Sequence, residues 1–202
     1  MNGGAWAVVA LLGLGACVGG EGGVDGGVTD AGVKGGTADG GGGAVGPDSG
    51  AAGPVLTSSA FVDGGTLPAE YTCDGQGHSP PLSWTAGPAG TVGYALLMHT
   101  DAKDGRKWSW VLYGIPAGTT ALTAGETGVG TAGKTSDGPQ LAYAPPCSQG
   151  PGEKLYTFTV YALSGAPSFP VPASQVTGPV LESAMAGKVL GQGVLTVGYT
   201  RP

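Results

Sequence analysis

The chain has 202 residues, a formal net charge of −6 at pH 7, and charged side chains at only 11% of its positions. From residue 55 to the last residue, seven Lys and Arg side chains stand against nine Asp and Glu side chains. Because a nucleic-acid-binding domain usually carries a basic patch that matches the phosphate backbone, this balance argues against a nucleic-acid partner.

The first 16 residues have the character of an export signal. Their apolar run, Ala5–Leu14, is far shorter than the ~20 residues that span a bilayer as a helix, although no Lys or Arg precedes it. The run ends in Leu14-Gly15-Ala16-Cys17, which resembles the lipobox of bacterial lipoproteins, in which the cysteine is acylated. We therefore predict lipidation of Cys17 and attachment to the bacterial cell envelope, with the outer membrane expected, through the lipid alone. Plain secretion and a retained anchor are the alternatives.

Residues 17–54 are expected to form a disordered tether. Glycine is unevenly spread along the chain and is concentrated in residues 19–50, and the tether has no aromatic residue. Such a segment cannot bury enough apolar surface to offset the entropy lost on ordering. As a Gly-rich coil it would reach roughly 30 to 35 Å, which would hold an exported domain clear of a membrane.

Residues 55–202 are numerous enough for one domain with one sizeable core. A first short strand is predicted at Leu56–Phe61, and an extended path at Ser79–Trp84, since residues before proline avoid the α region. Val92–Thr100 and Trp108–Ile115 are apolar on both faces, which predicts two central strands of a sheet.

A charged turn is expected between these central strands, at residues 101–107, so that they form a hairpin. His99 and Asp101 are two residues apart and share a face, and Ser109 could lie opposite them. These are the residue types of a Ser-His-Asp triad, but Ser109 lies within a strand and no G-x-S-x-G motif surrounds it. A hydrolase is therefore the least favoured function, and we expect no enzymatic activity. His78, alone in a turn, is expected to be solvated.

Residues 143–163 combine a shaped loop with a strand. Pro145 and Pro146 fix φ, whereas Gly150 and Gly152 permit positive φ. The following alternation predicts a half-buried strand from Leu155. One face would carry Tyr156, Phe158, Val160 and Ala162, and the other Thr157, Thr159 and Tyr161. Shaped loops on rigid strands often carry function, and a purely structural connection is the alternative.

Two segments lie on either side of this region. Ala117–Gln140 is predicted to be a long surface loop with at most one short strand. Downstream, Thr177 can cap a helix with Pro179 in its first turn. A helical spacing is then followed by Val180, Leu181, Ala184, Met185, Lys188 and Val189. Gly191–Tyr199 is predicted to be the final strand.

Taken together, these segments resemble the phosphatidylethanolamine-binding protein family, in its bacterial branch often called Raf-kinase-inhibitor-like. The resemblance covers roughly Leu56–Arg201. It implies a mainly-β fold, a β-sandwich around a large mixed sheet, with one helix near the C-terminus and a shallow anion-binding pocket at one sheet edge. No cofactor and no metal are expected. The segments that carry the resemblance are Tyr71–Gly75, Ser79–Trp84, Asp101-Ala102, Trp110–Tyr113 with Ile115-Pro116, Pro145-Pro146-Cys147 and Tyr156–Leu163.

The resemblance also implies a set of ligand-binding residues, with three departures from the usual pattern. His99 stands where the family's DPDAP segment has its first acid, and Ser109 and Lys154 stand where histidines are usual. Lys154 could bind an anion as a point charge, and Ser109 could donate one hydrogen bond. The implied set is His99, Asp101, Trp108, Ser109, Tyr143, Pro145, Pro146, Lys154 and Tyr156.

We therefore expect a binding protein for a phosphate- or carboxylate-bearing small ligand or a phospholipid headgroup. Aromatic and proline side chains would form the walls of the pocket, and a few polar groups would give specificity. The alternative is a regulatory module that binds a protein partner and whose pocket has degenerated to a structural role.

The chain has three cysteines. If Cys17 carries lipid, export leaves two cysteines in an oxidising compartment, where a disulfide is the default. Cys73 and Cys147 both lie in loops beside motifs that the resemblance gathers near one sheet edge. We predict that they are bonded, and two separately buried thiols are the alternative.

Overall fold

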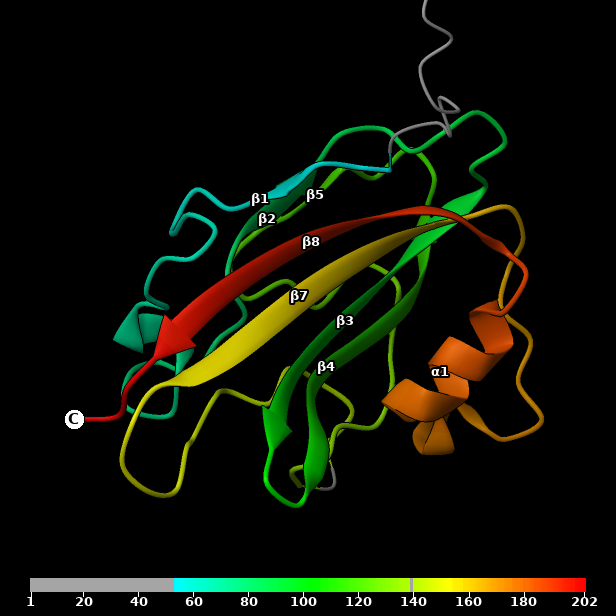
Figure 1. Cartoon of the computed structure of the whole chain (residues 1–202). Helices are drawn as coiled ribbons and strands as arrows, with labels where there is room; N and C mark the ends of the chain where they lie inside the picture. The colour runs from blue at the N-terminus through cyan, green and yellow to red at the C-terminus, as the bar shows by residue number, and fades with distance from the viewer. Residues whose placement is uncertain (1–52, 139) are drawn as a thin grey trace, which may run out of the picture. The chain divides into compact units, whose positions relative to one another are not determined.

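The computed structural model describes residues 53–138 and 140–202 (Figure 1). The predicted leader, Cys17 and nearly all of the predicted tether lie outside the described residues. Within them, no helix is long and apolar enough to cross a membrane.

Five strands form the larger of two sheets, in the order β6-β4-β3-β7-β8, and every neighbouring pair is antiparallel. Figure 1 shows the long, twisted strands β7 and β8 lying side by side across this sheet. The strands are β3 Gly93–Ala102, β4 Gly105–Pro116, β6 Thr131–Ala132, β7 Lys154–Leu163 and β8 Val189–Tyr199.

Three short strands form the second sheet, which packs against one face of the first. They are β1 Leu56–Thr57, β2 Leu82–Trp84 and β5 Ala121–Leu122, in the order β1-β2-β5. The predicted mainly-β sandwich with one helix is confirmed. One detail differs, because the large sheet is antiparallel rather than mixed. Parallel pairing among the described residues is limited to two single bridges, Thr66 with Gly198 and Lys134 with Thr177.

Alternation along the strands divides the apolar side chains between two cores. One lies between the sheets and includes Met98, Phe158 and Leu195. The other lies on the opposite face of the large sheet and includes Leu97 and Val111 with two residues of the helix. Each face of β3 and β4 thus packs against one of these cores, which explains why their sequences are apolar on both faces.

The β3–β4 hairpin is tighter than predicted. Ala102 pairs with Gly105, so the turn is only Lys103-Asp104 and not residues 101–107. Asp101 lies directly opposite Arg106, and their opposite charges stabilise strand pairing where the sequence suggested a loop.

The helix α1, Gly178–Met185, packs against β4 with its apolar residues Leu181 and Met185 (Figure 1). Thr177 occupies the N-cap position, but its side chain accepts no capping hydrogen bond, and Pro179 lies in the first turn as predicted. The predicted continuation to Val189 is wrong. Gly187 has a φ of +73°, which ends the helix, and Val189 already belongs to β8.

Two other boundaries were also predicted wrongly. β1 stops at Thr57 instead of Phe61, because the Ser58 hydroxyl donates to the Pro81 carbonyl and accepts from the Ala60 amide, which turns the chain. The loop 117–140 carries two short strands, β5 and β6, rather than one at most. Two short 3₁₀ helices, Ala69–Tyr71 and Ala173–Gln175, complete the described elements.

Candidate functional site

A pocket of about 300 Å³ opens where the β3–β4 hairpin, the loop after Pro146 and the start of β7 meet. Its lining contains four of the predicted ligand-binding residues. We call it the Lys154 pocket, and it is lined by Thr100, Ala102, Asp104, Lys107, Ser109, Asp137, Pro146, Cys147, Ser148, Gln149, Lys154 and Tyr156.

Ser109 reaches this pocket because of a β-bulge. Trp108 pairs with His99 and Trp110 pairs with Met98, so Ser109 is an extra residue in β4. Its side chain is only 4% exposed. The Ser109 carbonyl accepts a hydrogen bond from the Ala144 amide at 2.7 Å, which ties the loop that leads to the prolines onto this bulge.

The charges of the pocket are mixed. Lys107 donates to Asp104 at 2.7 Å, and this contact raises the pKa of Lys107 and lowers that of Asp104. Asp137 is the second carboxylate in the lining. Among the described residues, Lys154 forms no salt bridge. It is therefore the cation of the pocket that is not already engaged by a carboxylate.

Two further groups of the pocket are buried. Tyr156 is 3% exposed, and burial, followed by the nearby charge of Asp137, raises the pKa of its hydroxyl. The Ser148 hydroxyl oxygen is shielded from solvent and has no hydrogen-bond partner among the described residues. A buried polar group without a partner costs free energy, and a ligand that supplied an acceptor would recover it.

A disulfide joins Cys73 to Cys147 beside the pocket, with their Cα atoms 5.2 Å apart. The predicted pairing is thus present in the structure. The Cys73 amide also donates to the Pro146 carbonyl at 3.0 Å. Since Pro146 and Cys147 both line the pocket, these two links hold one of its walls in place.

His99, Asp101 and Trp108 lie elsewhere. His99 and Asp101 line a different hollow, together with Glu153, Lys154, Leu155 and Thr157. Arg106 donates to both carboxylate oxygens of Asp101, at 2.8 and 3.4 Å, and its guanidinium carbon lies 5.6 Å from the centre of the Trp108 ring. Trp108 is buried in the core beside the helix.

The environment of His99 favours its neutral form. Burial lowers the pKa of its imidazole, and the Arg106 charge lowers it further against the opposing effect of Asp101. Because Ser109 lines the Lys154 pocket while His99 and Asp101 face the other hollow, the structure does not bring the three triad residues together. Among the described residues, no three His, Cys, Asp or Glu side chains form a group that could hold a metal.

Tyr143 and Pro145, the last two predicted residues, line a shallow depression outside the Lys154 pocket. The Tyr143 hydroxyl donates to the Tyr71 carbonyl at 2.7 Å, so it is already engaged. The structure thus brings Ser109, Pro146, Lys154 and Tyr156 together in one pocket, and Lys154 also lines the hollow that contains His99 and Asp101.

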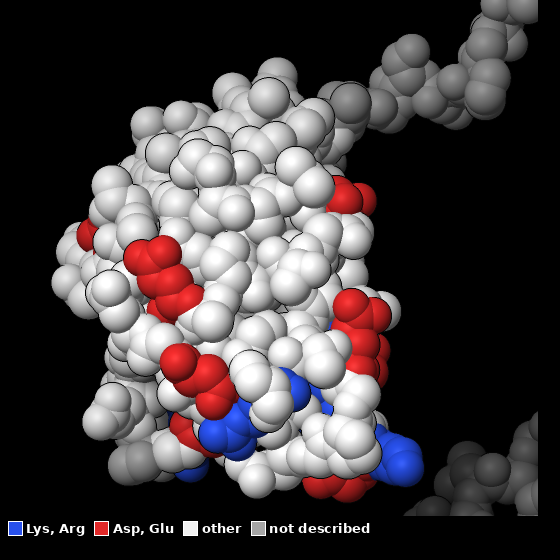
Figure 2. Space-filling view, turned by 90° about the vertical axis from the view of Figure 1, so that its left-hand side faces the viewer, with Lys and Arg blue, Asp and Glu red and all other residues white. Residues whose placement is uncertain are grey.

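Sequence reasoning missed Lys107, Asp104, Asp137 and Ser148. Lys107 could have been predicted as a pocket residue, because it is charged and lies two residues before Ser109. Ser148 follows Cys147 in a loop whose path no periodicity reveals. Charged side chains gather in the lower part of the face that Figure 2 shows, at the end of the domain where the β3–β4 hairpin lies in Figure 1.

Comparisons with known proteins agree on one family. Residues 57–200 match the sequence model described as phosphatidylethanolamine-binding protein. A UPF0098 protein of Methanothermobacter thermautotrophicus is 37% identical over 155 residues, which are 72% of this chain and 98% of that protein. A Mycobacterium tuberculosis protein whose name marks it as a candidate lipoprotein, LppC, is 33% identical over 68% of each chain.

Solved structures share the fold. A Chlamydia trachomatis homologue of the phosphatidylethanolamine-binding proteins, CT736, superposes with a TM-score of 0.67 at 28% identity, covering 74% of this chain and 99% of that one. Escherichia coli YbcL, described as a member of the mammalian family, gives a TM-score of 0.66 at 22% identity, covering 75% of this chain and 100% of its own.

Proposed function

The chain belongs to the phosphatidylethanolamine-binding protein family, and from this membership we propose that it is an extracytoplasmic binding protein for a small anionic ligand. The ligand would carry a phosphate or a carboxylate and would occupy the Lys154 pocket. The observation that carries the proposal is Lys154, a lysine that lines a pocket of about 300 Å³ and forms no salt bridge with any described carboxylate.

The other donors of the pocket support an anion. Ser109 offers a hydroxyl, and the Ser148 hydroxyl lacks a partner. Hydrogen bonds to a charged acceptor are stronger than neutral ones, so an anion would gain from each donor. Tyr156 and Pro146 supply apolar walls around these few polar groups, as is usual for small-molecule sites.

The carboxylates of the pocket narrow the ligand class. The Asp104 carboxylate accepts a hydrogen bond from Lys107. Asp137 also lines the pocket, and its negative charge helps to raise the pKa of the Tyr156 hydroxyl. A ligand with two or more negative charges would be repelled by Asp137. A zwitterion such as phosphoethanolamine would place its phosphate near Lys154 and its ammonium near Asp137, and so suits the mixed charges better than a free polyanion.

The location of the protein in the cell is part of the same proposal. We infer that the domain is exported and held at the cell envelope by lipid on Cys17, because the Leu14–Cys17 junction has lipobox character and one relative bears a lipoprotein name. A phospholipid headgroup would then be an accessible ligand. Free phosphoesters outside the cytoplasm carry the same recognised group.

Calorimetric titration tests the site. Phosphoethanolamine should bind the unmodified chain more tightly than inorganic phosphate, which has no ammonium group for Asp137, and Lys154→Ala should weaken each by roughly 10- to 100-fold, the range for one charge-assisted hydrogen bond. Lys134→Ala is the matched control, because Lys134 is exposed and lines none of the described pockets.

Equal losses in the two variants would mean that net charge and not the pocket controls affinity. An unmodified chain that binds neither anion at millimolar concentration would remove the proposal and would favour a protein-interaction role instead.

A further inference from the structure

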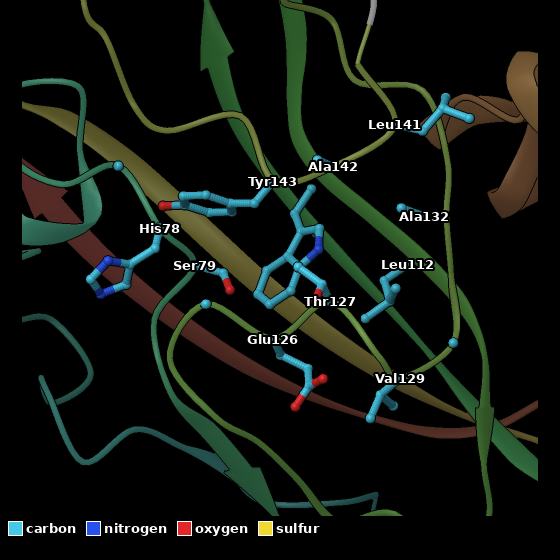
Figure 3. A pocket seen from close by; sticks show the side chains of 14 residues that line it. His78, Ser79, Leu112, Glu126, Thr127, Val129, Ala132, Leu141, Ala142 and Tyr143 are labelled. Carbon is cyan, nitrogen blue, oxygen red and sulfur yellow. The ribbon is translucent and has the colours of Figure 1, made fainter.

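A second cavity, of about 230 Å³, lies between β4 and the loops that cover it (Figure 3). We call it the Trp110 cavity. Its lining shares no residue with that of the Lys154 pocket. It is lined by Gly77, His78, Ser79, Trp110, Leu112, Gly125, Glu126, Thr127, Val129, Gly130, Ala132, Leu141, Ala142 and Tyr143.

Aromatic and aliphatic side chains form most of this lining. Trp110 is 2% exposed, and the Tyr143 ring meets it edge-on with centroids 5.4 Å apart. The hydrogen bond from the Tyr143 hydroxyl to the Tyr71 carbonyl fixes the orientation of that ring. Leu112 and Val129 add aliphatic surface, and Figure 3 shows them together on one side of the cavity. The site is thus a largely apolar space in which the Tyr143 ring is held in place.

One polar atom in the wall has no partner. Ser79 is only 3% exposed, and its hydroxyl oxygen makes no hydrogen bond to any described residue. Figure 3 shows Ser79 on the side of the cavity opposite Leu112 and Val129. The Ser79 carbonyl, in contrast, is engaged, because it accepts from the Gly125 amide at 2.9 Å. The hydroxyl is therefore a free donor and acceptor at the side of an apolar cavity, and burying it without a partner is costly.

The rim of the Trp110 cavity carries the carboxylate of Glu126. Glu126 accepts hydrogen bonds from the Gly128 amide at 2.7 Å and from the Thr123 hydroxyl at 3.0 Å. These contacts lower the pKa of its carboxyl group, with the Gly128 amide as the main cause. The carboxylate is consequently ionised near neutral pH, and it repels anions from the mouth of the cavity.

Size and chemistry together define a ligand class. An engineered apolar cavity of about 150 Å³ is large enough to bind benzene, so the larger Trp110 cavity admits one ring with a small substituent. We propose that the Trp110 cavity binds a small, uncharged aromatic molecule whose hydroxyl group pairs with Ser79. This site differs from the Lys154 pocket both in its residues and in the charge that it selects.

Phenol is the first probe, with toluene and benzoate as comparisons of similar size. The full chain, in detergent-free buffer, is titrated with each compound while the backbone amide and Trp indole resonances are followed by NMR. Phenol should saturate at about millimolar concentration, as expected for so small a ligand, and should shift resonances of residues 77–79 and 125–130. Benzoate should not, because Glu126 opposes its charge.

Three variants test whether the Ser79 hydroxyl is the hydrogen-bond partner of phenol. Ser79→Ala should weaken phenol by about three- to tenfold while leaving toluene unchanged, since only phenol uses the hydroxyl. Ala132→Leu should fill part of the cavity and weaken both compounds. Lys154→Ala should leave phenol binding unchanged, which separates this site from the proposed anion site.

Three results would overturn the proposal: no phenol-dependent shifts at millimolar concentration, shifts confined to residues around Lys154, or an equal loss of phenol and toluene in Ser79→Ala. If Ala132→Leu fails to fold, the phenol-to-toluene ratio in Ser79→Ala decides alone.

Discussion

His99 lies in an environment that discourages its charge. Its ring is partly buried, 5.4 Å from the ring of Trp108, and the nearby Arg106 adds a like charge to any protonated form. Asp101 opposes this effect only weakly because Arg106 already engages its carboxylate. Protonation of His99 should therefore lower the stability of the folded domain.

We predict that His99 makes the domain less stable in mild acid. A histidine whose pKa is lowered by folding binds its proton more readily in the unfolded chain, so stability is full above the ordinary pKa of about 6.5 and declines as the pH falls below it. His99→Gln removes that contribution. Thermal melts between about pH 8 and about pH 5 should show a smaller fall in Tm for the variant. If Tm falls equally with pH in the two proteins, the pKa of His99 is the same in the folded and unfolded states, and the prediction is wrong.

α1 contacts the sheet through its first residue. Gly178 lies directly on the Trp108 ring, and a β-carbon at position 178 would overlap the indole. The helix can approach β4 only because this residue lacks a side chain. The contact links the helix to the strand that also carries the Ser109 bulge.

Gly178→Ala should therefore destabilise the domain by roughly 1–3 kcal/mol, the usual cost of overpacking a core. The control is Gly118→Ala, because a β-carbon there meets no atom within 4 Å. Urea denaturation measures the free energy of unfolding of both variants. The clash argument fails if Gly178→Ala unfolds at the same urea concentration as the control.

Strand periodicity could be predicted from the sequence where one face of the strand is buried. The alternation in β7 is confirmed, with Tyr156, Phe158, Val160 and Ala162 in the core between the sheets. The end of α1 could not be predicted in this way. Lys188 and Val189 continue the helical spacing by coincidence, and only the positive φ of Gly187 separates them from the helix.

The candidate site was predictable in part for a similar reason. Lys154 and Tyr156 share a face of one strand, so their approach follows from spacing alone. The position of Ser109 depends on a bulge, which changes the face without any mark in the sequence. His99 and Asp101 were therefore grouped with Ser109, although the sheet separates them.

The charges of the whole domain are distributed unevenly. The stretch from residue 155 to residue 181 contains no charged side chain, and neither does the stretch from 189 to 200. In Figure 2 the uppermost part of the face shown carries no Lys, Arg, Asp or Glu, whereas both signs gather below. Several apolar side chains are also exposed, including Val55, Val92 and Val189.

Replacement of Cys17 by Ser tests the proposed anchoring of the molecule. If Cys17 carries lipid, Cys17→Ser should move the protein from the membrane fraction to the soluble fraction after cell lysis. Fractionation followed by immunoblotting measures the shift, and Cys147→Ser, which replaces a cysteine outside the lipobox, should stay with the membrane. A Cys17→Ser chain that remains in the membrane fraction with its leader removed would contradict lipid anchoring.

The described chain begins at Gly53, whose backbone lies against Gln192 in β8. Tyr199, at the other end of β8, pairs with Lys154. Tyr199 lies seven residue steps along the strand from Gln192, or about 23 Å at about 3.3 Å per step. A biosensor chip coupled to the chain upstream of Gly53 would therefore hold the domain at the end remote from Lys154. Random amine coupling, in contrast, would modify Lys154 in some of the molecules as well as the other lysines, so the choice of coupling chemistry decides how much of the immobilised protein can bind an anion.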